Sequence, residues 1–366
     1  MKKIPIPVII YLLVVAGINF VILDFASAQS NSAIEIIEIG QFDTDNFAAN
    51  IHVQDDTVFV SDSEGGLLII DVSNPENPVE RSQFDEGIDH VHEIQVDGNL
   101  AYLADYTDGF KIVDVSDLDN PTQIGRFHDG GEIGAFDIQE DVAFLADFED
   151  GLEIVNISDS SNPIELLKYT DLNYVFNIEI LDDLAYVSDF ISATESKLKI
   201  LNISDLSDIN EIAEYTIHGE IFTIDFIDNI AYAMCSYGGV KVFDITDPLA
   251  IVETGSYDDG GNAIDVEFYD EFIVVADGED GIEFIDSSDL SNLNETLTYD
   301  HDGSAFGIKI VDDMIYLADG EDGLLILQIV RLTDTVPPDM SIYIILLAIP
   351  VVIVVVVILL WIRKNQ

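Results

Sequence analysis

Carboxylates recur in pairs along this chain, three residues apart, and each pair begins at the end of a short apolar run. The pairs are Asp105 and Asp108, Asp147 and Asp150, Asp277 and Asp280, and Asp319 and Asp322. Carboxylate oxygens bind Ca²⁺, which takes about 6–8 oxygen ligands. None of the pairs lies in an Asp-x-Asp-x-Asp-Gly calcium loop, and Asp and Gly are also common in tight turns. The pattern therefore predicts either Ca²⁺ binding by these residues or hydrogen-bonded turns.

A second candidate site contains histidines. His90 and His92 precede Glu93, and His128 lies further along the chain. Side chains two residues apart on a strand share a face, so these four residues could form a metal-binding or acid–base site. They could equally be polar residues of a hydrated surface, because a His-x-His pair with a distant third histidine is a weak signature. We assign them a candidate binding role.

Signatures of common enzyme classes are absent from the sequence. It contains no Gly-x-Ser-x-Gly motif, phosphate loop, dinucleotide fingerprint or paired cysteines. Cys235 is the only cysteine, which rules out an intrachain disulfide and predicts a buried thiol. The sequence therefore favours a non-enzymatic role, and it assigns no catalytic residue and no cofactor other than the candidate Ca²⁺.

The charge of the chain limits its partners. Asp and Glu number 71 against 13 Lys and Arg, which gives a formal net charge of −58. Nucleic-acid binding depends on neutralising phosphates with Lys and Arg, so it is excluded. The field of such a surface attracts cations and basic partners. A solvated acidic surface suited to salty surroundings is the alternative explanation.

The elements that position these carboxylates are repeated hairpins. An apolar run ends at Asp105, a short turn closes on Asp108-Gly109, and residues 110–115 form a second apolar run, which is typical of a β-hairpin. The last residue of the first run recurs every 42 to 46 residues, at Asp62, Asp105, Asp147, Asp189, Cys235, Asp277 and Asp319. This period matches four-stranded propeller blades and predicts seven of them.

The two ends of the repeat region predict how the ring closes. Each of the first six units ends in an aromatic residue, at Phe84, Phe127, Tyr169, Tyr215, Tyr257 and Tyr299. The seventh unit stops one strand short, and residues 34–42 resemble the missing strand. We therefore predict an all-β, seven-bladed propeller of four-stranded blades that the N-terminal strand closes, which leaves no open edge.

The propeller interpretation also places the side chains. Loops that join the second strand to the third share one rim with the loops that join successive blades, and this rim collects most of the loop acid. Equivalent positions on the first strands predict a polar ring around the central channel, at His52, Gln95, Asp137, Glu179, Asp225, Glu267 and Lys309. Four units have an Asp at the end of the third strand, and these residues, Asp71, Asp114, Asp244 and Asp286, are predicted to cap the turns that follow.

Residues 68–75 (Leu-Ile-Ile-Asp-Val-Ser-Asn-Pro) and 111–116 (Lys-Ile-Val-Asp-Val-Ser) resemble the LVIVD repeat of prokaryotic surface proteins. The stretch 102–105 is also similar to YVTN-type propellers of surface layers. The resemblance extends over nearly all of residues 34–329. It implies a β-propeller at the cell surface, and it implies no reaction.

Apolar segments at both ends predict membrane attachment. Residues 1–28 have the charged start, apolar body and small-residue cleavage motif of a signal peptide, with an uncleaved anchor as the alternative. Residues 342–362 are long and apolar enough for one transmembrane helix. The predicted organisation is therefore a propeller ectodomain over 29–332, a spacer over 333–341, the helix, and a cytoplasmic tail over 363–366.

Taken together, these features predict a single-pass protein of the cell membrane with an extracellular propeller. Its acidic rim would act in binding, adhesion or cell-surface interaction with a protein or glycan, with or without Ca²⁺. Two alternatives stay open. One is a metal-dependent, lactonase-like hydrolase centred on the channel, and the other is a structural component of the cell envelope.

Overall fold

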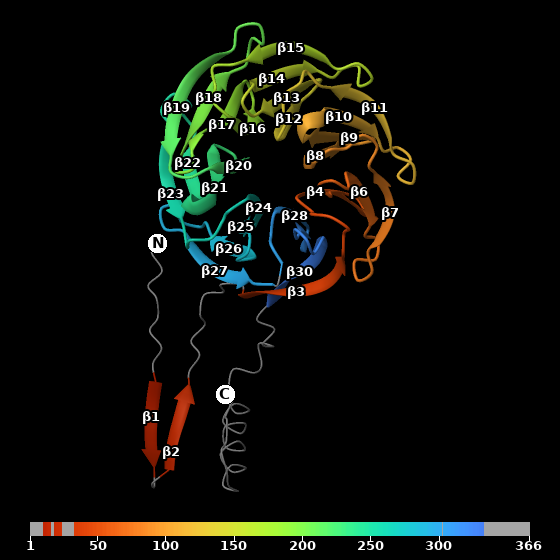
Figure 1. The fold of residues 1–366 in the computed structure, drawn as a ribbon. Helices are drawn as coiled ribbons and strands as arrows, with labels where there is room; N and C mark the ends of the chain where they lie inside the picture. Colours follow the sequence, from red (N-terminus) through yellow and green to blue (C-terminus); the bar gives the residue numbers. More distant parts are fainter. Residues whose placement is uncertain (1–9, 16–17, 24–32, 302, 333–366) are drawn as a thin grey trace, which may run out of the picture. The chain divides into compact units, whose positions relative to one another are not determined.

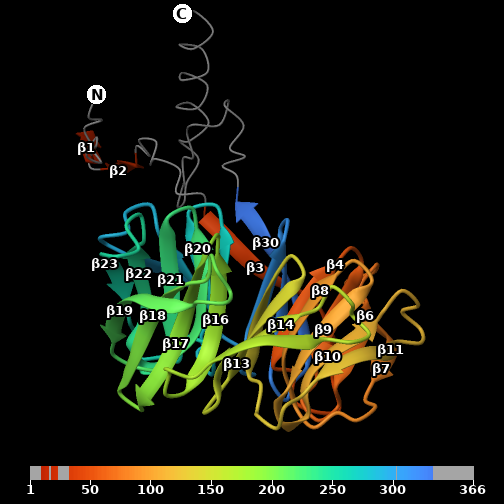
Figure 2. The same cartoon turned by 90° about the horizontal axis from the view of Figure 1, so that it is seen from above.

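Seven four-stranded antiparallel sheets are arranged in a ring around a central channel (Figure 1). The structure is a computed structural model that describes residues 10–15, 18–23, 33–301 and 303–332. Residues 36–329 form one compact unit. Viewed at right angles, the strands of this unit run along the channel axis (Figure 2). The predicted seven-bladed, all-β propeller is confirmed.

The four strands of each blade lie in order from the channel outward. Blade 1 contains β4 (Asn50–Gln54), β5 (Thr57–Ser61), β6 (Leu67–Asp71) and β7 (Val79–Phe84). Blade 2 contains β8 (Val91–Asp97), β9 (Leu100–Asp105), β10 (Gly109–Asp114) and β11 (Thr122–Phe127). Blade 3 contains β12 (Ala135–Gln139), β13 (Val142–Asp147), β14 (Gly151–Asn156) and β15 (Ile164–Tyr169). Blade 4 contains β16 (Val175–Leu181), β17 (Leu184–Ser192), β18 (Glu195–Asn202) and β19 (Asn210–Ile217).

Three further blades complete the ring. Blade 5 contains β20 (Ile221–Ile227), β21 (Ile230–Cys235), β22 (Gly239–Asp244) and β23 (Val252–Tyr257). Blade 6 contains β24 (Asp265–Tyr269), β25 (Phe272–Ala276), β26 (Ile282–Asp286) and β27 (Asn294–Tyr299). Blade 7 contains β28 (Gly307–Val311), β29 (Met314–Ala318), β30 (Leu324–Leu332) and β3 (Ala33–Phe42). Short 3₁₀ helices, η1 (Tyr106–Asp108) and η2 (Ser236–Gly238), lie in two rim loops.

The N-terminal strand of the propeller closes the ring, as predicted. β3 pairs with β30 as the outermost strand of blade 7, although the two strands come from opposite ends of the repeat region. A pair of hydrogen bonds between Ala48 and Gly320, 2.9 and 3.2 Å long, also joins blade 7 to the loop that enters blade 1. Closure gives blade 7 its fourth strand, so that all seven blades have four.

The core lies between the faces of neighbouring blades. Every residue of β5 and β25 is buried, because their blades are covered on both faces. Between blades 1 and 2, for example, Phe59 and Ile69 pack in one cluster with Leu103. Strands buried on both faces have no reason to alternate apolar and polar residues, which explains the continuous apolar runs of the repeat.

Turn chemistry accounts for part of the negative charge. The turn between the first and second strands of each blade contains a residue in the left-handed region, with φ between 51° and 58°. These residues are Asp55, Gly98, Glu140, Asp182, Asp228, Asp270 and Asp312. Asp adopts this region more readily than most residues with a side chain. The predicted caps are also confirmed, because Asp71, Asp114, Asp244 and Asp286 each accept a backbone N–H two residues later at 2.9 Å.

The predictions for the two ends of the chain stay predictions. Within residues 1–28, the described parts form an antiparallel hairpin of β1 (Ile10–Val15) and β2 (Ile18–Leu23). The predicted spacer, transmembrane helix and tail, residues 333–366, lie outside the described residues. The described residues contain no helix that is long and apolar enough to cross a membrane.

Candidate functional site

A buried side chain lies at or near the end of the second strand of every blade, at the rim of the blade-joining loops. It is a carboxylate in six blades, at Asp62, Asp105, Asp147, Asp189, Asp277 and Asp319. Asp105 Oδ1 accepts hydrogen bonds from the backbone N–H groups of Asp89 (2.9 Å) and His90 (2.8 Å), which lie in the loop entering the same blade. Asp189 Oδ1 accepts two such bonds, at 2.7 and 3.1 Å. The repeated Asp therefore holds the rim loop onto its blade.

Blade 5 departs from this pattern. Cys235 occupies the position of the repeated Asp and is a fully buried, free thiol, as predicted. Burial raises the pKa of its thiol to about 12. The thiolate form is the reactive one, so this cysteine is an inert part of the core.

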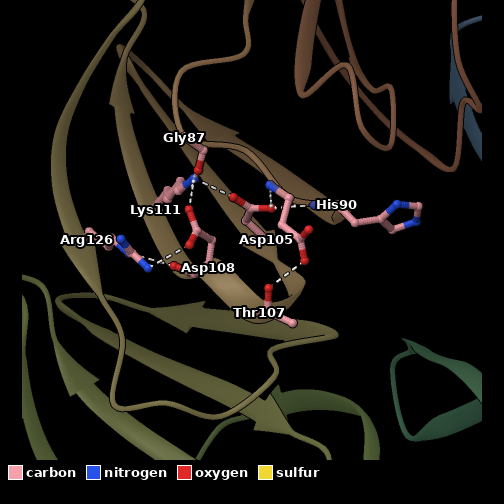
Figure 3. A network of polar contacts seen from close by, with 8 residues as sticks. Gly87, His90, Asp105, Thr107, Asp108, Lys111 and Arg126 are labelled. Carbon is pink, nitrogen blue, oxygen red and sulfur yellow. Dashed lines mark hydrogen bonds and ion pairs between the residues drawn. The ribbon is translucent and has the colours of Figure 1, made fainter.

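Blade 2 supplies its own cation to the rim (Figure 3). The Lys111 ammonium is 1% exposed and contacts the Asp105 carboxylate, the Gly87 carbonyl oxygen and, at 3.1 Å, Asp108 Oδ2. Arg126 Nη2 lies 3.0 Å from Asp108 Oδ1. Two of the predicted calcium ligands, Asp105 and Asp108, are thus already neutralised by side chains of this chain.

In two further blades, a lysine neutralises carboxylates at the rim. In blade 3, Lys168 Nζ lies 2.8 Å from Asp129, 2.9 Å from Glu153 and 3.2 Å from Asp150. In blade 4, Lys199 Nζ lies 3.2 Å from Asp189 and 3.1 Å from Glu211.

In blade 7 a histidine takes the place of the lysine. His301 Nε2 lies 2.7 Å from Asp319 Oδ1. Burial lowers the pKa of His301, but the hydrogen bond and the charge of Asp319 outweigh burial, so that the pKa lies above its usual value.

The eight predicted calcium ligands do not form one group. Within the described part of the chain, three sets of carboxylates have oxygens within 4.8 Å of one another. The sets are Asp129, Asp147 and Asp150; Asp129, Glu153 and Glu165; and Asp259, Glu283 and Glu295. Only Asp147 and Asp150 belong to the predicted eight, and calcium binding there stays a prediction. Our sequence interpretation missed the glutamates, although Lys or Glu recurs on the third strands at the position of Glu153 and Glu283.

The structure brings two of the four candidate binding residues, His90 and His92, together. The rings of His90 and His92 are 4.9 Å apart, whereas His128 has no described contact with either. Burial lowers the pKa of His92 to about 4, so this ring is neutral at pH 7. Glu93 faces the next blade instead, where its Oε2 accepts the backbone N–H of Phe136 at 2.8 Å. Burial raises the pKa of Glu93 to about 8.

An aromatic cluster extends from His92 across four blades at this rim. We call it the aromatic mouth, and it consists of His92, Tyr106, Phe148, Tyr174, Phe176 and Phe222. The ring of Phe148 stacks on Tyr174 at 4.8 Å, and Phe176 lies 5.2 Å from Phe222. The repeat pattern did not predict this cluster, because its members lie in different blades.

Local backbone irregularities position these aromatic side chains. His92, Phe176 and Phe222 are the extra residues where the pairing of the first and second strands shifts in blades 2, 4 and 5. A β-bulge of this kind redirects a side chain and is common next to binding sites. Tyr106 and Phe148 follow the repeated Asp and have φ values of 22° and 23°. Positive φ is costly for a residue with a bulky side chain.

Acidic side chains border the aromatic mouth. The interaction of the Tyr106 hydroxyl with Glu132, together with burial and the charge of Glu132, raises the pKa of Tyr106 to about 12. Burial and the charges of Glu132, Glu149 and Glu220 also raise the pKa of Tyr174. The mouth therefore combines aromatic faces with negative charge.

The predicted polar ring of the channel is also present. Its members occupy equivalent positions in the seven blades, because each pairs with the equivalent residue of the second strand of its blade. Asp137 pairs with Phe144 in blade 3, and Lys309 pairs with Tyr316 in blade 7. Lys309 Nζ lies 2.6 Å from Glu267 Oε1. Burial raises the pKa values of Asp137, Glu179, Asp225 and Glu267.

The closed ring of repeated four-stranded blades defines a β-propeller repeat protein. Within that class the chain belongs to the LVIVD repeat family, whose model matches residues 47–86, 89–129, 130–171, 260–301 and 302–333. The predicted resemblance is therefore confirmed. The matches leave out residues 172–259, which contain all strands of blades 4 and 5 and include Cys235.

Solved structures share the fold at low sequence identity. The chain is similar to the computationally designed Ika8 protein (12% identity, TM-score 0.61, 80% of this chain and 99% of that one). It is also similar to the WD40 β-propeller domain of Doa1 (12%, 0.60, 81% and 95%) and to a chain of the Mitotic Checkpoint Complex (11%, 0.63, 84% and 96%). The curated proteins contain no matching sequence. These likenesses establish the fold alone.

Proposed function

We propose that this propeller is a binding module that recognises cationic groups, such as lysine or arginine side chains of a partner protein, at the aromatic mouth. The observation that carries the proposal is the combination of packed aromatic rings with the bordering carboxylates of Glu132, Glu149 and Glu220. A cation over an aromatic face gains about 0.5–2 kcal/mol, and nearby carboxylates add attraction. Positive φ at two of its residues supports a functional role for the cluster.

We also propose that the module acts outside the cell while attached to the membrane, in adhesion or surface interaction. Support comes from the apolar stretch 342–362 and the signal-like stretch 1–28 of the sequence. An acidic surface of net charge −58 accelerates the approach of a basic partner by long-range attraction. The aromatic mouth then recognises the cation through short-range contacts, which salt screens much less than long-range attraction.

The test measures binding of a fluorescent pentalysine peptide to the full-length protein, by anisotropy, at about 0.15 M and at about 0.5 M salt. We expect Phe176→Ala and Phe222→Ala each to weaken binding about 3- to 30-fold, because each removes one aromatic face. Leu249→Ala is the control, since this exposed side chain lies in a turn on the opposite rim. Equal affinities of all variants would contradict the proposal.

A further inference from the structure

Blades 3 and 6 carry the same five carboxylates at equivalent positions. The equivalent residues are Asp129 and Asp259, Asp147 and Asp277, Asp150 and Asp280, Glu153 and Glu283, and Glu165 and Glu295. The strand pairing shows the equivalence. Glu165 and Glu295 lie on the fourth strands, and each pairs with the third-strand residue directly after the β-bulge of its blade. The two blades therefore build the same acidic cradle at the rim.

The cation of the cradle is present in blade 3 and missing from blade 6. In blade 3, Glu153 is paired across the sheet with Lys168, whose ammonium contacts four of the five carboxylates at 2.8 to 3.9 Å. In blade 6, Glu283 is paired with Thr298 instead. The Thr298 and Tyr257 hydroxyls donate to Glu295, but residues 258–301 contain no Lys or Arg, so blade 6 supplies no such cation of its own.

A buried oxygen of blade 6 lacks a partner. Asp277 is only 3% exposed, and its Oδ1 accepts no hydrogen bond within the described structure. Gly261 packs directly against this carboxylate, because a Cβ there would lie 1.9 Å from Asp277 Oδ2. Burial and the charges of Asp259 and Asp280 raise the pKa of Asp277 to about 7, and burial with the bond to Asp259 raises that of Glu283 to about 9. In blade 3, burial raises the pKa values of the equivalent groups but Lys168 lowers them, so that the pKa of Asp147 is about 6 and the pKa of Glu153 is about 8.

We propose that blade 6 binds one Ca²⁺ ion in place of the lysine of blade 3, through Asp259, Asp277, Glu283 and Glu295. One oxygen each of Asp259, Glu283 and Glu295 lies within 4.8 Å of the other two. Two ligands on opposite sides of a Ca²⁺ ion are separated by about 4.6–5.2 Å, since Ca–O distances are about 2.3–2.6 Å. Ligands of Mg²⁺, at about 2.0–2.1 Å, are held closer together.

This site is separate from the proposed recognition of cationic groups, since it shares no residue with the aromatic mouth. Its ligands also differ from the Ca²⁺ ligands that the paired carboxylates of the sequence suggest, apart from Asp277. Blade 3 has carboxylates at the same four positions but supplies Lys168 as the cation, so the cradle without a lysine belongs to blade 6.

The experiment measures Ca²⁺ binding to the full-length protein by calorimetry at about 0.15 M salt, with Mg²⁺ as competitor. We expect one saturable Ca²⁺ site in the natural protein. Thr298→Lys places an ammonium where blade 3 has one, so it should abolish this site and raise the melting temperature of the Ca²⁺-free protein. Ser256→Lys is the matched control, because it adds the same charge at the equivalent position of blade 5, and it should leave the site intact.

The converse variant tests the same idea from the other blade. Lys168→Thr gives blade 3 the residue of blade 6, and we expect it to create a second saturable Ca²⁺ site. Circular dichroism establishes that each variant is folded. The proposal is overturned if the natural protein shows only weak, unsaturable binding, as screening of a highly charged surface produces. It is equally overturned if Thr298→Lys and Ser256→Lys bind Ca²⁺ alike.

Discussion

Lys111→Met is expected to lower the free energy of unfolding by about 3–5 kcal/mol, because it leaves a buried carboxylate without its cation. Lys111 is 1% exposed, and Asp105, its partner, is fully buried. Asp105 also accepts the N–H groups of Asp89 and His90, so it cannot turn toward solvent without releasing the loop that enters blade 2. Methionine preserves the length and apolar contacts of the lysine stem, which isolates the loss of charge.

Thermal and urea unfolding measure this effect, and the expected fall in melting temperature is about 5–10 °C. Lys241→Met is the matched control, because Lys241 has the equivalent position in blade 5, where Cys235 replaces the Asp. Asp105→Asn combined with Lys111→Met should recover much of the stability, since the amide oxygen still accepts the loop N–H groups and no charge stays buried. Equal losses for Lys111→Met and Lys241→Met would show that the ion pair contributes nothing specific.

The fold could be predicted from the sequence because its determinants are periodic. The repeated Asp of each unit, the apolar runs on either side and the aromatic end of the fourth strand recur at nearly constant spacing. Closure followed from one missing strand and one unmatched strand, residues 34–42. The caps at Asp71 and Asp114 were also accessible, since a side chain that bonds a backbone two residues away requires no knowledge of the tertiary structure.

The sites could not be predicted in the same way, because they depend on departures from the period. Lys168 and Thr298 occupy equivalent places, and only the strand register shows that each faces a glutamate of the third strand. The aromatic mouth depends on β-bulges at His92 and Phe222, and no residue type in the sequence indicates a bulge at these positions. The repeated Asp could be recognised in the sequence. Its hydrogen bonds to loop N–H groups, which favour a structural role, could be recognised only from the structure of the rim.

The stability of the protein is expected to fall as the pH rises from 7 to 9 in the absence of divalent cations. Burial raises the pKa of Glu93 to about 8, and burial with the bond to Asp259 raises that of Glu283 to about 9, whereas the unfolded chain has ordinary values near 4.5. The folded protein therefore binds more protons than the unfolded chain in this range, so stability decreases with pH. Each carboxyl group protonated only in the folded state contributes about 1.4 kcal/mol per pH unit.

Other titrating groups do not reverse this trend between pH 7 and 9. Burial lowers the pKa values of His52 and His92 to about 4, so their contribution increases with pH only up to about the ordinary histidine value of 6.5. The depressed pKa of Asp129, at about 2, affects stability only in acid. In the same window, the raised pKa of His301 contributes a further loss as the pH rises.

Thermal unfolding in a chelator at pH 7, 8 and 9 measures the slope, and two variants assign it. Glu93→Gln should flatten the slope, because the amide keeps the oxygen that accepts the Phe136 N–H but cannot titrate. Glu80→Gln, at an exposed position of β7, should leave it unchanged. Ca²⁺ should also reduce the slope, because an ion in blade 6 would stabilise the ionised form of Glu283. A melting temperature that stays constant or rises from pH 7 to 9 would show that these buried carboxyl groups are already ionised at neutral pH.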